Sequence, residues 1–221
     1  MDEIEWWEFD TAAELAEQVV GDIGFVIESA VGAHGNARIA LPGEGAPEAL
    51  LTALAKAKEV DWSKVTILPT DDRVPAEAAP RLDKLFGRKG GTVMPLVETG
   101  ATDLQATARQ ADSRLAELHW PLDLVCLGVG ADGRVAGIGP GPELDRAVSG
   151  PRERRAVAGG SGVTLTGAAL SSARAVMIVV QGAETRRTLE QAIKDGPLSA
   201  LPIGRLLAAI DAPVDIFWSA E

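Results

Sequence analysis

The spacing of apolar residues alternates along the chain between the two-residue period of strands and the longer period of helices. Ile4 to Phe9 is predicted as a first strand, and Thr11 as the cap of a helix whose apolar positions are Leu15, Val19, Val20, Ile23 and Val26. Further apolar runs predict strands over 37–41, 65–68, 93–96, 122–127, 175–181 and 214–218. Helices are expected over 48–58, from Asp103, and up to Ile193. This succession of strand, turn and helix is typical of an α/β protein.

The predicted strand from Leu122 to Leu127 leads into the most glycine-dense turn of the chain, residues 128–141. Ligand sites of α/β sheets gather at the carboxyl ends of strands, so function is expected there. The glycines at 128, 130 and 133 also have the spacing of a dinucleotide-binding fingerprint, but that fingerprint requires a helix to begin in the loop. Gly137, Gly139, Pro140 and Gly141 oppose a helix, which argues against a nicotinamide or flavin cofactor.

Composition narrows the possible classes of protein. The 221 residues, of which 46% are hydrophobic, are expected to form one domain over residues 1–221. A formal charge of −11 argues against binding to nucleic acid or to an anionic membrane. The acidic amino terminus and the lack of a long apolar run predict a cytoplasmic protein. A single cysteine, Cys126, excludes an internal disulfide, and its apolar surroundings indicate an inert core residue.

The glycine-dense stretch resembles the motif Gly-x-Gly-x-Asp-Gly-His-Thr-Ala-Ser, followed by Phe-Pro-Gly, of the 6-phosphogluconolactonase family. The matching residues are Gly128, Gly130, Asp132, Gly133, Ala136, Pro140 and Gly141. The main departure is Arg134, which stands where the family has its general-base histidine.

Two further turns match the family, each with changes. Ala40, Leu41, Gly43 and Pro47 align with Ala-Leu-Ser-Gly-Gly-Ser-Thr-Pro, in which Glu44 replaces the second glycine and Gly45 and Ala46 replace hydroxyl residues. Asp71-Asp72-Arg73 resembles the family's Asp-Glu-Arg, a turn in which paired acids and an arginine could orient a sugar phosphate. The alternatives are that Glu44 faces solvent and that the Asp-Asp-Arg turn is a self-satisfied cap and ion pair.

The last third of the chain continues the resemblance. Residues 163–170 resemble the family's Arg-x-Thr-Leu-Thr-x-x-Ala-Leu, with Gly162 at the arginine position. Residues 182–184 match Gly-Ala-Glu-Lys, with Thr185 replacing the lysine, for which Arg186 or Arg187 could compensate. Residues 150–162 are expected to be an exposed, mobile connection. Four arginines lie in this connection or just before it, and solvation explains them more simply than contact with substrate: Arg146, Arg152, Arg154 and Arg155.

The resemblance implies a three-layer, mostly parallel α/β sheet flanked by helices, akin to sugar-phosphate isomerases. It implies hydrolysis of 6-phosphogluconolactone without metal or organic cofactor, with a sugar phosphate as the partner and a monomer favoured. Arg134 and Asp132 occupy the catalytic positions. The substrate-binding positions implied are Gly43, Glu44, Gly45, Asp71, Asp72, Arg73, Gly130, Gly133 and Arg186.

Arginine cannot act as the base, because its pKa stays above about 12. The two histidines, His34 and His119, lie before strands, and seven or eight extended residues at roughly 3.3 Å each put them about 23 to 26 Å from the site end of the sheet. Lactonase activity is therefore expected to be reduced or lost. The alternatives are a non-catalytic homologue that binds a sugar phosphate or a protein, and an amino-sugar-phosphate deaminase, which the 71–75 and 163–170 segments disfavour.

We predict that Glu44 and Arg134 approach within ion-pairing distance and partly fill the cleft, because each alone would leave an unpaired charge in a partly enclosed pocket. Glu44→Gly should then raise the affinity for a sugar phosphate, measured by calorimetric titration. Unchanged affinity would count against such a gate, as would charged ends more than about 6 Å apart.

Overall fold

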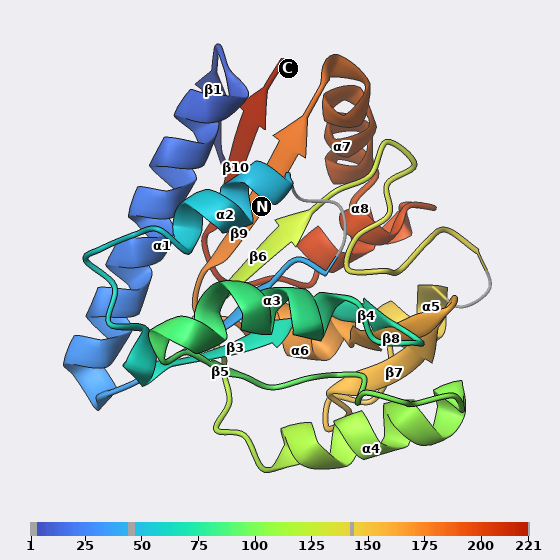
Figure 1. Cartoon of the computed structure of the whole chain (residues 1–221). Helices are drawn as coiled ribbons and strands as arrows, with labels where there is room; N and C mark the ends of the chain where they lie inside the picture. The colour runs from blue at the N-terminus through green and yellow to red at the C-terminus, as the bar shows by residue number, and fades with distance from the viewer. Residues whose placement is uncertain (1–3, 44–46, 142–143, 221) are drawn as a thin grey trace.

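The computed structural model describes residues 4–43, 47–141 and 144–220. Seven parallel strands form the main sheet (Figure 1), in the order β1 (Ile4–Phe9), β10 (Val214–Ser219), β9 (Val176–Gln181), β6 (Leu124–Gly128), β2 (Ala37–Leu41), β3 (Val65–Pro69) and β5 (Thr92–Val93). A second, antiparallel sheet has the order β4 (Asp71–Arg73), β8 (Gly162–Leu165) and β7 (Ala156–Gly159).

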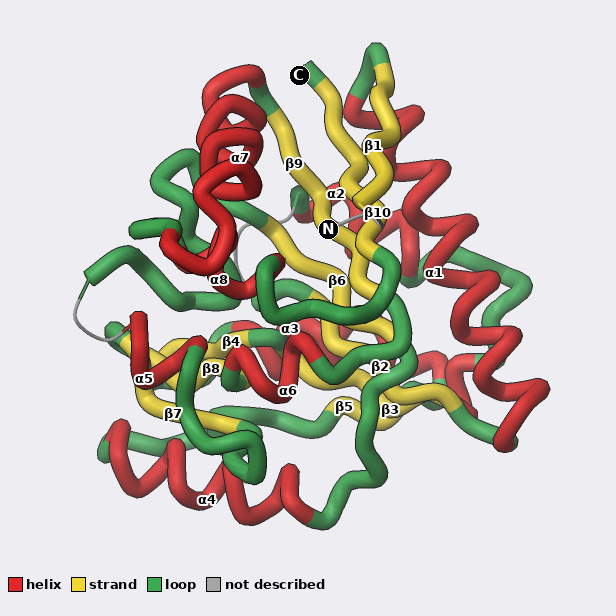
Figure 2. Tube along the Cα trace, turned by 180° about the vertical axis from the view of Figure 1, so that it is seen from behind, coloured by secondary structure: helices red, strands yellow, loops and turns green. Residues whose placement is uncertain are grey.

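Helices cover both faces of the main sheet, so the fold is the predicted three-layer α/β arrangement (Figures 1 and 2). One face carries α1 (Ala12–His34), α2 (Glu48–Leu54) and α3 (Ala78–Phe86). The other carries α4 (Leu104–Ala116), α6 (Gly167–Ser171), α7 (Ala183–Asp195) and α8 (Pro202–Leu207), together with the small sheet. Shorter pieces are α5 (Leu144–Val148) and the 3-10 turns Trp62–Lys64, Gly87–Lys89 and Gly196–Leu198.

The apolar pattern explains how the central strand separates two cores. Every residue of β6 is buried, as its continuous apolar run predicted. Leu124 and Cys126 face the α1 side, whereas Val125 and Leu127 face the α4 side, because successive side chains of a strand point to opposite faces. Burial raises the pKa of the Cys126 thiol to about 12, which agrees with an inert core residue.

Helix α1 shows how local sequence sets element boundaries. The Thr11 side chain accepts a hydrogen bond from the Glu14 N–H, and the Glu14 carboxylate accepts one from the Thr11 N–H, which closes a capping box. Gly35 ends the helix with φ of +83°. The buried stripe is Leu15, Val19, Ile23, Ile27 and Ala30. Of the predicted stripe, Val20 and Val26 are only partly buried.

Several boundaries differ from the sequence-based expectation. Helix α2 ends at Leu54 rather than at residue 58, and β5 contains only Thr92 and Val93.

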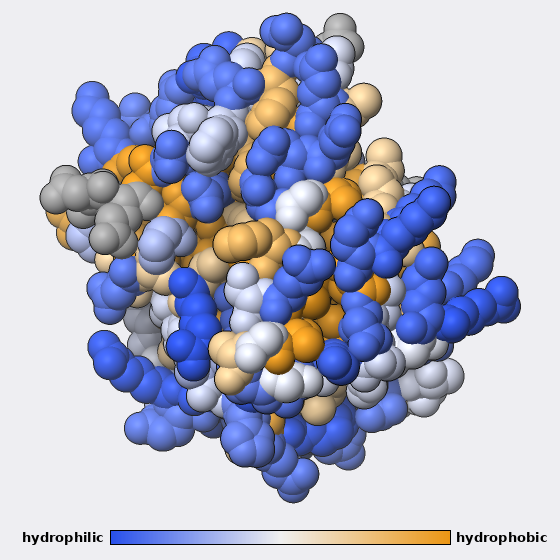
Figure 3. Space-filling view, turned by 90° about the vertical axis from the view of Figure 1, so that its left-hand side faces the viewer, coloured by the Kyte–Doolittle hydropathy of each residue, from blue (hydrophilic) through white to orange (hydrophobic). Residues whose placement is uncertain are grey.

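The side of the molecule that carries α1 is largely hydrophilic, with hydrophobic residues between the charged ones (Figure 3). Within the described residues, no helix has the length and apolar character needed to cross a membrane.

A buried carboxylate ties the amino-terminal edge of the sheet together. Asp123, only 2% exposed in its side chain, precedes β6. Its Oδ1 lies 3.1 Å from His34 Nε2 and 3.6 Å from Arg174 Nε, and its Oδ2 accepts a hydrogen bond of 2.8 Å from the Arg38 N–H. The carboxylate thereby joins α1, β2 and the turn before β9 to the central strand.

Asp123→Asn should lower the free energy of unfolding by about 1 to 3 kcal/mol, because it weakens the hydrogen bonds that the buried carboxylate makes with His34 and the Arg38 N–H. Arg174→Gln is the matched control. The Arg174 side chain is 63% exposed, so its loss should cost only about 0 to 1 kcal/mol. Urea unfolding of both variants measures the difference, and equal losses would contradict the prediction.

Candidate functional site

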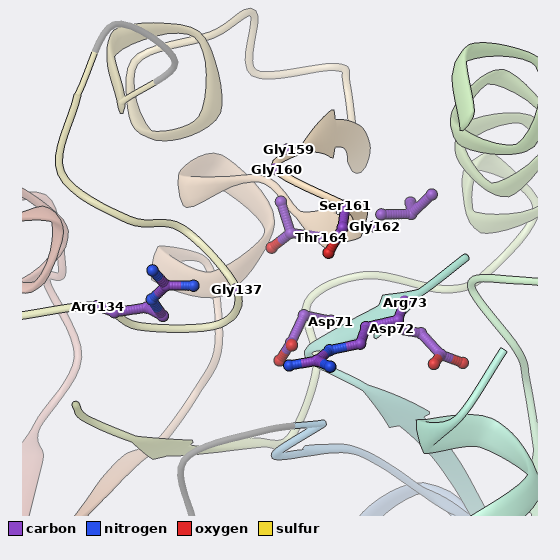
Figure 4. A pocket seen from close by; sticks show the side chains of 11 residues that line it. Asp71, Asp72, Arg73, Arg134, Gly137, Gly159, Gly160, Ser161, Gly162 and Thr164 are labelled. Carbon is purple, nitrogen blue, oxygen red and sulfur yellow. The ribbon is translucent and has the colours of Figure 1, made fainter. Parts of the chain in front are cut away.

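Three segments that follow strands of the main sheet or belong to the small sheet enclose a cavity of about 60 Å³. They are the β6 loop, strand β4 and the turn between β7 and β8. The residues that line this cavity are Asp71, Asp72, Arg73, Arg134, Gly137, Gly159, Gly160, Ser161, Gly162, Val163 and Thr164 (Figure 4). A second cavity of about 200 Å³ shares Arg134, Gly137, Gly159 and Gly160 with it. The cavities therefore form where the sequence predicted a site.

The glycine-rich loop after β6 is a series of tight turns. The Gly130 N–H donates to the Arg134 carbonyl at 2.9 Å, and the Gly133 N–H donates to the Gly130 carbonyl at 2.9 Å. Gly133 has φ of +76°, and a Cβ there would lie 2.9 Å from the Leu201 side chain. In its described part, residues 129–141, the loop contains no helix, and the next helix begins at Leu144. This geometry differs from the dinucleotide-binding fingerprint, which opens a helix.

Strand β8 holds the loop in place. The Thr164 hydroxyl donates to the Ala136 carbonyl at 2.6 Å, and Thr164 is buried. Ala136 has φ of +48°, which is unfavourable for a residue with a Cβ and indicates that surrounding contacts impose the conformation. Gly137 follows with φ of +69°, and a Cβ there would lie 3.0 Å from the Asp71 Cβ.

Asp71 lies at the centre of these contacts and is buried. Its Oδ1 accepts a hydrogen bond of 2.9 Å from the Thr70 hydroxyl. Gly43, in the turn after β2, lies so close that a Cβ there would overlap the Asp71 carbonyl oxygen. A glycine is therefore required at residue 43 by the close approach of two loops.

The carboxylate of Asp72 is directed to helix α3. Its oxygens accept hydrogen bonds from the N–H groups of Glu77, Ala78 and Ala79 at 2.8, 2.7 and 3.0 Å. These groups begin α3, so Asp72 acts as the cap of that helix. These contacts agree with the capping alternative, and a role in substrate binding stays a prediction.

Two arginines face the cavity from opposite sides (Figure 4). Arg73 extends from β4 beside Asp71, and Arg134 extends from the glycine-rich loop. Arg134 Nε lies 3.5 Å from Asp132 Oδ2, and the Arg134 N–H donates to Asp132 Oδ1 at 3.1 Å. The Arg134 and Asp132 side chains are 51% and 53% exposed, so this ion pair is a weak, solvated one.

Arg186 is not brought to the described lining of either cavity. Its guanidinium donates to Glu8 and Glu190 at 2.8 Å each and lies 4.4 Å from the centre of the Trp218 ring. The hydrogen bond from Arg186 lowers the pKa of Glu8, and the bonds to Glu8 and Glu190 raise the pKa of Arg186. The structure thus places Arg186 in a network at the β1 and β10 edge of the sheet.

Both histidines lie at the amino-terminal ends of the strands, on the side of the sheet away from the cavity at Arg134, as predicted. They line a separate cavity of about 580 Å³ together with Arg38 and Lys64. His34 is paired there with Asp123, and the His119 carbonyl accepts a hydrogen bond of 2.7 Å from Arg38. Neither histidine is among the residues that line the cavity at Arg134.

The expectation of a mobile connection over residues 150–162 was wrong in its second half. Residues 156–165 form the β7–β8 hairpin, and its turn, Gly160 and Ser161, lines the cavity. Alternating Ala-Val-Ala and Val-Thr-Leu segments around Gly-Gly-Ser-Gly are a hairpin signal that could have revealed it. In the predicted basic cluster, Arg152 and Arg154 are exposed, as the solvated alternative expects. Arg154 also pairs with Asp112 of α4, and Arg155 stacks over Trp120.

Arg81 is a positioning residue that the sequence did not indicate. Its guanidinium donates to the carbonyl groups of Pro42 and Gly43 at 3.2 and 2.7 Å, and so holds the turn after β2. Glu44 and Gly45 lie outside the described residues, so their predicted roles and the Glu44–Arg134 pair stay predictions.

The fold and the cavity together define an α/β protein of the sugar-phosphate isomerase and lactonase type. A family model described as glucosamine-6-phosphate isomerases/6-phosphogluconolactonase matches residues 10–216, and the chain belongs to that family. A 6-phosphogluconolactonase from Rhizobium meliloti (strain 1021) is 32% identical over 226 residues, which cover 96% of this chain and 97% of that protein.

Solved structures agree with this assignment. A 6-phosphogluconolactonase from Shewanella baltica OS155 has a TM-score of 0.87 and 27% identity, and covers 99% of this chain and 98% of its own. A monomeric glucosamine-6-phosphate deaminase has a TM-score of 0.76 at 15% identity, covering 97% of each chain. The last similarity shows that the deaminases share the fold.

Thr164→Val should loosen the glycine-rich loop, because the Ala136 carbonyl loses a buried donor, at a cost of about 1 to 3 kcal/mol. Amide hydrogen exchange over residues 130–138 should become faster than in the unaltered protein. Thr164→Ser keeps the hydroxyl and should exchange at nearly the original rate. If the two variants exchange alike, the hydroxyl does not position the loop.

Proposed function

We propose that the chain is a 6-phosphogluconolactonase-like protein that binds a sugar phosphate in the cavity beside β4 and hydrolyses the lactone at a strongly reduced rate. The observation that carries the proposal is the place of Arg134. Its side chain faces the cavity, and the motif resemblance assigns the family's histidine to this position; the described lining contains no histidine. Membership of the family supports the substrate class.

Lactone hydrolysis requires a proton acceptor. A water oxygen attacks C1, the water proton passes to a base, the bond between C1 and the ring oxygen breaks, and the ring oxygen takes a proton. Arg134 cannot accept the first proton, because a guanidinium stays charged at neutral pH. It can donate hydrogen bonds to the developing oxyanion, and Asp132 is suited to orient it through the contact at 3.5 Å.

The expected loss of rate follows from the missing base. General acid–base catalysis typically contributes about 10²- to 10⁴-fold, so the protein should be slower than a histidine-containing relative by about that factor. Residual turnover would come from positioning of the phosphate near Arg73 and from electrostatic stabilisation by Arg134. An assay of lactone consumption, corrected for spontaneous hydrolysis, tests the proposal.

The second candidate is a homologue that binds a sugar phosphate or a protein without any turnover. The exchange of the base for a permanent cation is the observation that favours it over a normal lactonase. Deamination is the weaker enzyme candidate, because the Asp71-Asp72-Arg73 turn and the segment 163–170 resemble lactonases. For either enzyme, we also propose that the protein is a monomer and lies in the cytoplasm. As a lactonase, it would belong to the pentose phosphate pathway.

Arg134→His should raise the corrected lactonase rate by about tenfold or more by restoring a base, yet leave it below that of the Rhizobium meliloti relative assayed in parallel. Glu44, Gly162 and Thr185 remain changed at other positions of the family pattern. A side chain at residue 162 would also overlap the Asp72 carbonyl oxygen, so that change is built into the β4–β8 pairing.

Arg134→Gln serves as the control, since it removes the charge and adds no base, and it should not gain activity. A rate equal to that of the relative from the single histidine substitution would overturn this prediction. An unaltered protein already as fast as the relative would overturn the proposed loss of rate.

A further inference from the structure

The cation that replaces the base changes which form of a sugar phosphate the cavity should prefer. In the lactone, C1 is a neutral ester carbonyl, whereas in the hydrolysed acid it carries a carboxylate. Guanidinium groups bind carboxylates through paired, charge-assisted hydrogen bonds that are about twice as strong as neutral ones. A histidine at residue 134 would serve the neutral carbonyl, and an arginine there serves the anion.

We propose that this cavity selects an open-chain aldonate phosphate, with the ligand's carboxylate held by Arg134 and its phosphate on the Arg73 side. The inference rests on the proposed sugar-phosphate binding and adds to it the chemical class of the ligand. It makes Arg134 a specificity-determining residue for the acid over sugar phosphates that lack a carboxylate.

The surroundings of Arg134 leave its guanidinium able to take a second carboxylate. Its contact with Asp132 is through Nε at 3.5 Å, longer than a strong charged hydrogen bond of about 2.7 to 2.9 Å. The side chain is half exposed and borders both cavities. A Cβ at Gly139 would lie 3.4 Å from one Arg134 terminal nitrogen, so the glycine leaves room for the guanidinium beside the loop.

The carboxylates near the cavity do not oppose this assignment. The charge of Asp72 is balanced by three N–H groups at the start of α3, at 2.7 to 3.0 Å. Asp71 accepts a hydrogen bond from Thr70 and lies beside Arg73 in Figure 4. Asp71 is also an acceptor suited to the hydroxyl groups between the two charged ends of an aldonate phosphate.

The test is calorimetric titration of the full chain at fixed ionic strength with 6-phosphogluconate and with D-glucitol 6-phosphate. The second compound has the same open chain and phosphate but no carboxylate. The acid should bind about 10- to 100-fold more tightly, which is the usual size of an effect from hydrogen bonds to charged groups. Arg134→Gln should weaken binding of the acid by that factor and leave glucitol 6-phosphate within about twofold.

Arg88→Gln is the matched control. Arg88 is exposed, is not among the lining residues, and loses the same charge. It should change neither affinity by more than about twofold, since an exposed charge outside the cavity is screened by water and salt. Circular dichroism of each variant confirms that it is folded.

The outcomes separate the inference from the function on which it rests. Equal affinity for both phosphates, or an Arg134→Gln variant that still prefers the acid, would overturn the role of Arg134 and leave sugar-phosphate binding intact. Failure of both compounds to bind at millimolar concentration would overturn the proposed function itself, together with the inference.

Discussion

The close approach of backbone segments around Asp71 is the constraint on which the site depends. Gly43 from the turn after β2 and Gly137 from the loop after β6 both contact Asp71, and at either position a Cβ would clash with it or crowd it. Three loops can meet there because parallel strands end at the same edge of a sheet. Glycine is the residue that allows the approach, and the hydrogen bond from Thr164 to Ala136 keeps the loops together.

The amino-terminal ends of the strands are held together in a different way. The buried carboxylate of Asp123 is paired with His34 and Arg38, so the amino-terminal ends of the strands are held by polar contacts to one carboxylate rather than by glycine. The two histidines of the chain line a cavity at these strand ends. Imidazole, the side chain most often used for general-base work at neutral pH, is thereby kept away from the cavity.

Arg134 connects the packing to the chemistry. The loop that carries it keeps the backbone turns expected of a ligand-binding loop, with Gly130 and Gly133 hydrogen bonded as a compact unit. The Arg134 side chain borders the cavity, so the identity of this side chain sets the chemistry offered to a ligand while the loop backbone stays in place. A binding site can persist on such a scaffold when its reaction has been weakened, because fold and function depend on different residues.

The sequence by itself determined the α/β class, the buried central strand, the Thr11 cap of α1 and the position of the glycine-rich loop, because these depend on local spacing and on residue type. It also placed both histidines at the far edge, since the length of an extended strand is set by backbone geometry. Tertiary structure alone decided which side chains meet. Arg186 joins Glu8 and Trp218, and the β7–β8 turn reaches the cavity, although each is distant in sequence from its partners. Asp72 turns to α3, five to seven residues further along the chain, because the packing of that helix brings its first N–H groups to the carboxylate. Such contacts depend on how the layers pack, and local patterns carry little information about side chains that meet across a fold.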